Sequence, residues 1–149
     1  GECYDQLAHM RASLGQLEPA RAAFSRVDAC LEHGALDADR SDQLAVLHDD
    51  AAAAAALLDR RSDAALAHAD AALARLTPHA AYWWVQAEIA ELELARGEAL
   101  LALDRPDDAR AALTRALPVF EDMSRTRTQL LDGVFLARAR ALLAEPPAP

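Results

Sequence analysis

The chain has 149 residues, of which 53% are hydrophobic and only 5% aromatic, and its net charge is −9 at pH 7. Nucleic-acid-binding domains concentrate Lys and Arg on one face, whereas this chain is strongly acidic and arginine is its only strongly basic residue type. We therefore expect no direct contact between this segment and nucleic acid. No apolar run approaches the ~20 residues that span a bilayer, so we also expect no membrane partner.

Alanine, leucine and arginine are abundant, and they favour helix because they lose little rotamer freedom in it. We predict an all-α fold of about seven helices, at residues 1–14, 17–33, 41–59, 62–76, 78–103, 106–123 and 126–144. Ser41 and Ser62 are predicted N-caps, and Pro78 and Pro106 are expected in first turns. Pro118 should kink the sixth helix or loosen its last turn. We expect the proline-rich tail, residues 145–149, to be disordered.

The same pattern of small and apolar residues recurs in three stretches of the chain, at spacings of 45 and 44 residues. Three sets of positions share these spacings: Ala20, Ala65 and Ala109; Leu31, Leu76 and Phe120; and Ala8, Ala53 and Gly97. Small residues let the two helices of a hairpin approach closely, and apolar positions at i, i+4 and i+7 form one buried stripe. The pattern predicts three helical hairpins of similar design.

The first of these units resembles the tetratricopeptide repeat, a helix–turn–helix motif. The positions that match are Tyr4, Leu7, Ala8, Gly15, Ala20, Phe24 and Val27. The later units lack the turn glycine and are about ten residues longer than the family's 34-residue unit. The resemblance implies an α-solenoid of antiparallel hairpins, with repeats at about 1–40, 41–77 and 78–123 and a capping helix at 126–144.

Catalytic motifs are missing from the sequence. The five histidines are in no metal-ligand spacing, and there is no Cys-x-x-Cys, no phosphate-binding loop and no nucleophile elbow. Without lysine, Schiff-base chemistry is excluded. The many carboxylates are interpreted as charge on helix surfaces, often beside arginine. We therefore predict a non-enzyme with no catalytic, cofactor-binding or metal-binding residues.

The aromatic cluster Tyr82, Trp83 and Trp84 has two interpretations. Four consecutive helical residues cover about a full turn, so the cluster together with Val85 cannot face one core. At least one tryptophan should therefore lie near the surface or contact a neighbouring repeat. The cluster either packs within or between hairpins or serves as an anchor for a peptide or a second subunit.

In the tetratricopeptide family the first helix of each hairpin lines a concave groove. Carried over by the repeat alignment, the groove positions are Glu2, Asp5 and His9 in the first unit, Leu47, Asp50 and Ala54 in the second, and Glu91, Leu94 and Glu98 in the third. This acidic lining favours a basic or amphipathic peptide or protein. It lacks the Lys and Asn with which family members clamp chaperone C-termini. The alternative is a groove filled by another part of the same protein.

The long Ala- and Arg-rich repeats are similar to the C-terminal arrays of actinobacterial helix-turn-helix transcription regulators. Segments 124–127 and 136–139 carry this likeness. It implies a cytoplasmic regulatory module of a larger bacterial protein, able to form a homodimer, and we expect further domains upstream. Two alternatives stay open: a constitutive scaffold, and an accessory domain of a kinase or nucleotide hydrolase. Cys3 and Cys30 are expected as free thiols, although a bond between them stays open.

Overall fold

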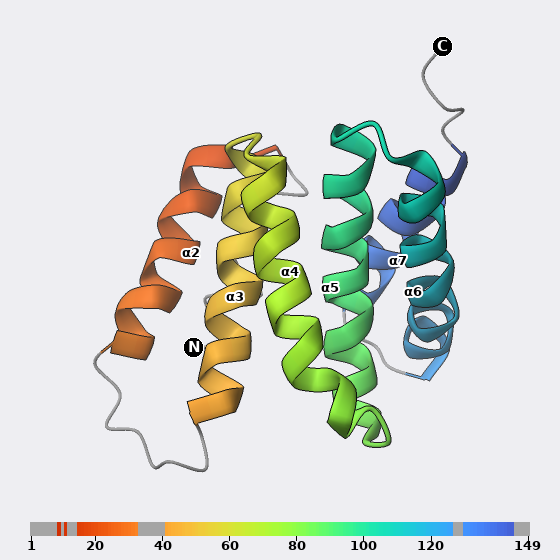
Figure 1. Ribbon diagram of the computed structural model, residues 1–149, viewed down its shortest axis with the longest axis horizontal. Helices are drawn as coiled ribbons and strands as arrows, with labels where there is room; N and C mark the ends of the chain where they lie inside the picture. Colours follow the sequence, from red (N-terminus) through yellow and green to blue (C-terminus); the bar gives the residue numbers. More distant parts are fainter. Residues whose placement is uncertain (1–8, 10, 12–14, 33–40, 127–129, 145–149) are drawn as a thin grey trace.

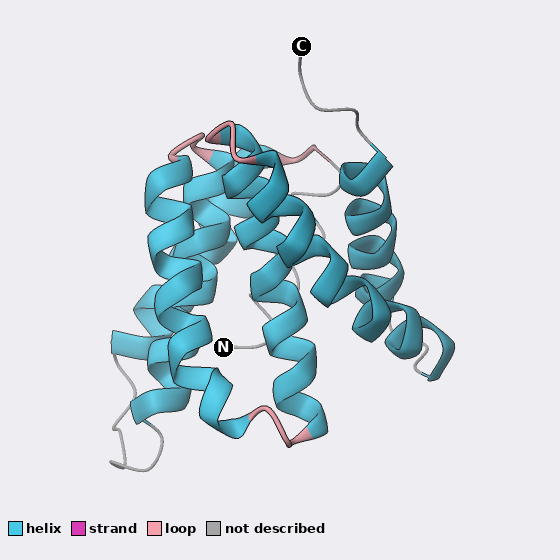
Figure 2. Ribbon diagram, turned by 45° about the vertical axis from the view of Figure 1, so that its right-hand side comes forward, coloured by secondary structure: helices cyan, strands magenta, loops and turns pink. Residues whose placement is uncertain are grey.

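The computed structural model describes residues 9, 11, 15–32, 41–126 and 130–144, and over these residues it contains helices and turns without a strand (Figures 1 and 2). The helices are α2 Leu17–Glu32, α3 Ser41–Leu58, α4 Ser62–Leu76, the short 3₁₀ helix η2 Thr77–His79, α5 Trp83–Ala102, α6 Pro106–Thr126 and α7 Leu130–Ala144. The predicted all-α class is confirmed. Most of the predicted first helix, Cys3 and the tail 145–149 lie outside the described residues, but His9 and Arg11 are helical.

Each helix packs against the one that follows it, from α2 through α7 (Figure 1). The described turns lie at the two ends of the helices (Figure 2). Beyond these sequential neighbours, α5 also packs against α3 and α7. The odd-numbered helices, which are the first helices of the predicted hairpins and the predicted cap, therefore lie next to one another.

The turns into α2, α4 and α6 have the same backbone geometry. Gly15, Arg60 and Asp104 have φ angles of 73°, 57° and 57°, in the left-handed region. The residue after each donates its backbone N–H to a carbonyl five residues earlier, at 2.8, 2.8 and 2.9 Å for Gln16, Arg61 and Arg105. This is the hydrogen bond of a Schellman motif, which ends a helix through one left-handed residue. The three left-handed residues are 45 and 44 apart, the spacings of the sequence pattern.

Two of these turns therefore keep the left-handed conformation without glycine. A left-handed residue with a Cβ costs roughly 1–2 kcal/mol, and aspartate tolerates the conformation better than arginine does. In the sequence, the missing glycines are a difference between the later units and the first one. The backbone shows that the turn itself is retained.

Several predicted helix boundaries differ from the structure. Ser62 is the first residue of α4 rather than its N-cap, a position that Arg61 occupies without a side-chain capping bond. Pro78 lies in η2, and α5 begins only at Trp83, whereas Pro106 opens α6 as predicted. The α6 helix continues through Pro118 to Thr126, because this proline is on an exposed face where water can satisfy the carbonyl that loses its N–H partner.

The repeated alanines Ala20, Ala65 and Ala109 are fully buried. Phe120 and Leu76, at equivalent positions of the last two units, are buried as well. The largest cluster joins α5, α6 and α7 and centres on Leu94, Leu113, Phe120 and Phe135. Alanine is thus the residue that brings helix backbones together, while a few large residues fill the space between α5, α6 and α7.

The two helices of the third hairpin lie close together at Gly97. A Cβ atom built on Gly97 would lie 2.7 Å from both Cγ and Cδ2 of Leu113 on α6. In the preceding hairpin, 44 residues earlier, both equivalent positions are fully buried alanines, Ala53 and Ala69. The two hairpins therefore use different residue pairs at the same crossing: glycine with leucine, and alanine with alanine.

This exchange predicts a compensating pair of substitutions. Gly97→Ala gains ~1 kcal/mol of helix propensity but forces Leu113 to move, which typically costs ~1–3 kcal/mol, so we expect net destabilisation. Leu113→Ala alone should cost ~2–5 kcal/mol through the cavity that it leaves. The double variant recreates the alanine pair of the preceding hairpin and should be more stable than the sum of the single effects by at least ~1 kcal/mol. Urea unfolding of the wild type and the three variants measures this coupling. If the free-energy changes of the two single variants simply add in the double variant, the two hairpins do not share the same helix crossing.

Candidate functional site

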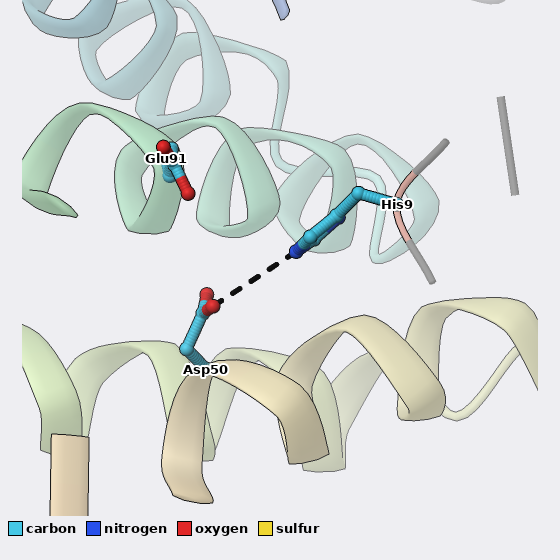
Figure 3. Close-up of side chains that lie close together, drawn as sticks. All are labelled: His9, Asp50 and Glu91. Carbon is cyan, nitrogen blue, oxygen red and sulfur yellow. Dashed lines mark ion pairs between the residues drawn. The ribbon is translucent and has the colours of Figure 1, made fainter. Parts of the chain in front are cut away.

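Three of the residues predicted to line a groove lie close together, on the predicted first helix, α3 and α5 (Figure 3). His9 Nε2 is 3.9 Å from Asp50 Oδ2. One ligand atom each from His9, Asp50 and Glu91 all lie within 4.8 Å of one another. The Asp50 side chain is only 5% exposed and that of His9 18%. The sequence thus places a histidine and two carboxylates at one point between three helices.

Helix α7 closes one side of this point. The ring of Phe135 lies edge-on to the ring of His9, with 5.4 Å between the ring centroids. Phe135 also contacts Phe120, at 5.6 Å between centroids, and so connects the histidine to the largest core cluster.

The other predicted groove positions are arranged differently. Leu94 is buried in the cluster formed with α6 and α7, and Glu98 accepts a hydrogen bond from Arg138 of α7. Leu47 and Ala54 are half-buried on α3, while Glu2 and Asp5 lie outside the described residues. Along α5, therefore, α7 contacts side chains that the family resemblance assigns to a ligand. Binding of a partner in this groove stays a prediction.

Neighbouring aspartates on α3 point to different helices, as successive residues on a helix must. Asp50 faces His9, whereas Asp49 Oδ1 is 2.9 Å from Nδ1 of His68 on α4. The second oxygen of Asp49 lies 3.7 Å from Nε of Arg75, also on α4. Asp49 thus connects the two helices of its hairpin.

The third hairpin has a buried acid at the position equivalent to Asp49. Glu93 is 8% exposed and accepts hydrogen bonds from Arg115 of α6, from Nε at 2.8 Å and from Nη2 at 2.9 Å. The hydrogen bond to Glu93 raises the pKa of Arg115 above its usual value. In both hairpins a carboxylate on the first helix is therefore held by basic groups on the second.

Sequence reasoning missed these acids, because it interpreted the carboxylates as surface charge. The buried acidic residues of the described chain are Asp49, Asp50, Glu93 and Asp132. A sequence signal for Asp49 and Glu93 is that positions 49 and 93, 44 residues apart, are both acidic. The repeat alignment named Asp50 and Glu91 as groove positions but did not predict their closeness to His9, which is distant in the sequence.

The aromatic cluster reaches the surface at Tyr82 and Trp83. Tyr82 is the N-cap of α5 with extended backbone, and Trp83 is the first residue of the helix. Their exposed fractions are 58% and 69%, while Val85 is fully buried. The side chain of Trp84 lies outside the described part of the structure. Trp83 is thus the most exposed large hydrophobic residue that the structure describes.

Of the remaining histidines, His48 and His68 are in ring contact, with 6.4 Å between their ring centroids. His48 and His79 are exposed and His68 is half-buried, while His33 lies outside the described residues. Among the helices described, none combines the length and apolarity that crossing a membrane requires.

Comparison of the chain with protein-family models, with curated proteins and with solved structures found no significant match.

The buried acid of the third hairpin gives a testable stability effect. Arg115→Ala leaves Glu93 without its two hydrogen bonds, and a bond to a charged group contributes ~1.5–3 kcal/mol. The arginine side chain is 52% exposed, so solvent screening should reduce the loss to about 1–2 kcal/mol. Arg110→Ala, an exposed arginine on the same helix, should change stability by less than ~0.5 kcal/mol. Equal urea midpoints for the two variants would show that the hydrogen bonds from Arg115 to Glu93 do not contribute to stability.

Proposed function

We propose that this chain is a non-catalytic interaction module, a solenoid of helical hairpins that binds a protein or peptide. Three observations support the solenoid: the repeated left-handed turns, the buried alanines at equivalent positions, and the packing of α5 against both α3 and α7. The single observation that carries the binding role is the exposed aromatic pair Tyr82 and Trp83 at the start of α5.

Exposure of two adjacent large aromatics is unfavourable in isolation, because each leaves apolar area in water. Tryptophan and tyrosine are enriched among the residues that dominate interface energies, since they bury much area with few rotamers. The pair lies in a chain whose other large hydrophobic residues, apart from Leu17, are buried or half-buried wherever the structure describes them. A binding partner is the interpretation that accounts for this placement.

The backbone that presents the pair is well fixed. Tyr82 donates its backbone N–H to the carbonyl of His79 at 3.1 Å. The Gln86 side chain of α5 donates to the carbonyl of Ala80 at 3.2 Å, and the Thr77 hydroxyl donates to the carbonyl of Leu73 at 2.7 Å. An anchor on a pre-organised turn loses less conformational entropy when a partner binds.

The aromatic pair is a better candidate for the contact than the acidic groove, because α7 contacts Leu94 and Glu98 on the α5 side of that groove. The net charge of −9 favours a basic or amphipathic partner. By its resemblance to regulator arrays, the module belongs in a larger bacterial transcription regulator. A scaffold or an accessory domain would use the same surface constitutively.

Substitution of the aromatic pair tests the binding role. Partners captured by the wild-type chain from extract of its own cells are identified, purified and titrated against Tyr82→Ala/Trp83→Ala and against Leu17→Ala. Leu17 is the matched control, an exposed large hydrophobic residue on another helix. We expect the double variant to bind at least ~30-fold more weakly, as for a hot spot of 2 kcal/mol or more, and the control to bind normally.

Both variants should keep the thermal stability of the wild-type chain, since exposed substitutions rarely change it by more than ~0.5 kcal/mol. Undiminished affinity of the double variant would refute the aromatic pair as the contact. Failure of the wild-type chain to bind any partner would refute the interaction module itself.

A further inference from the structure

The point where His9, Asp50 and Glu91 converge has the chemistry of a metal site. An imidazole nitrogen and two carboxylates form a mixed nitrogen and oxygen donor set, which suits Zn²⁺ and related divalent transition metals. The three residues come from separate helical segments, so no local spacing in the sequence reveals them.

The distances agree with such a site. Two ligands of a tetrahedral Zn²⁺ ion at ~2.0–2.2 Å lie about 3.4 Å apart. His9 Nε2 and Asp50 Oδ2 are 3.9 Å apart, too far for a hydrogen bond and within about half an ångström of that separation. By contrast, His68 and Asp49 are 2.9 Å apart and make a direct hydrogen bond. The ligand atoms of the first set lie within 4.8 Å of one another, so the three side chains have to move closer together to reach metal-ligand geometry.

Burial and charge favour a cation at the same point. Asp50 is 4% exposed and lies within 4.8 Å of a second carboxylate. Two neighbouring carboxylates repel each other and are costly to bury as anions. With a neutral imidazole the three side chains carry a charge of −2, which one divalent cation balances. The Phe135 ring packs nearly perpendicular to the His9 ring, with 5.4 Å between the centroids.

We propose that His9, Asp50 and Glu91 bind one divalent transition-metal ion, with Zn²⁺ preferred. Three protein ligands leave a fourth position for water or a ligand group. The ion would join the N-terminal segment, through His9, to α3 and α5, and so fix the first hairpin against the next two. This site is separate from the aromatic pair and does not depend on the proposed interaction role.

Zn²⁺ titration tests the site. Metal-stripped protein carrying Cys3→Ser and Cys30→Ser, which removes the two thiols as competing ligands, is titrated with Zn²⁺ by calorimetry. We expect one equivalent to bind, with Mg²⁺ at least ~100-fold weaker because it disfavours imidazole. His9→Gln, Asp50→Asn and Glu91→Gln should each weaken Zn²⁺ binding by at least ~100-fold. His48→Gln, an exposed histidine two residues from Asp50, is the control and should bind Zn²⁺ normally.

Thermal unfolding provides an independent readout. At 100-fold excess over its dissociation constant, Zn²⁺ should raise the Tm of the parent by about 5–10 °C and leave the Tm of the three variants unchanged. Absence of Zn²⁺ binding by the parent, or equal binding by His9→Gln and Glu91→Gln, overturns the proposal. The comparison of His9→Gln and Glu91→Gln with the parent tests the proposal even if Asp50→Asn does not fold.

Discussion

The structure depends on close backbone contact within helical hairpins. Ala20, Ala65 and Ala109 have no exposed surface, and Gly97 leaves no room for a Cβ beside Leu113. Small residues at these crossings set how near the helices lie, and the left-handed turns at Arg60 and Asp104 set where each second helix starts. The same two features thus recur in the hairpins α3–α4 and α5–α6, at the spacing of the sequence pattern.

Close packing by alanine has a consequence for the charged residues. Alanine side chains are short, so carboxylates on α3 and α5 come within reach of neighbouring helices instead of extending into water. Asp49 and Glu93 are held by basic groups within their hairpins. Asp50 has an imidazole and a second carboxylate near it, which makes it the one buried acid whose described surroundings suit a metal ion. The aromatic pair is on a separate surface, so the two proposals concern independent parts of the molecule.

Sequence reasoning predicted the helices well, because periodic apolar positions and repeated alanines report directly on packing. It was less accurate at helix ends. Ser62 was predicted as a cap, although the Schellman turn at Arg60 already determines where α4 begins. It predicted no metal-binding residues because it searched for ligands near one another in the sequence. The repeat alignment placed His9, Asp50 and Glu91 in one groove, but the distances between them depend on how three helices pack, which periodicity along one helix does not contain.

The hairpins depend on one turn geometry that recurs along the chain. Backbone NMR tests this recurrence directly. Chemical shifts and the coupling between the amide and α protons report φ at Gly15, Arg60 and Asp104. The account predicts positive φ at all three, including the two residues that carry a Cβ. Negative φ at Arg60 and Asp104, with positive φ at Gly15 alone, would contradict the shared turn geometry. The repeat would then be a similarity of sequence only.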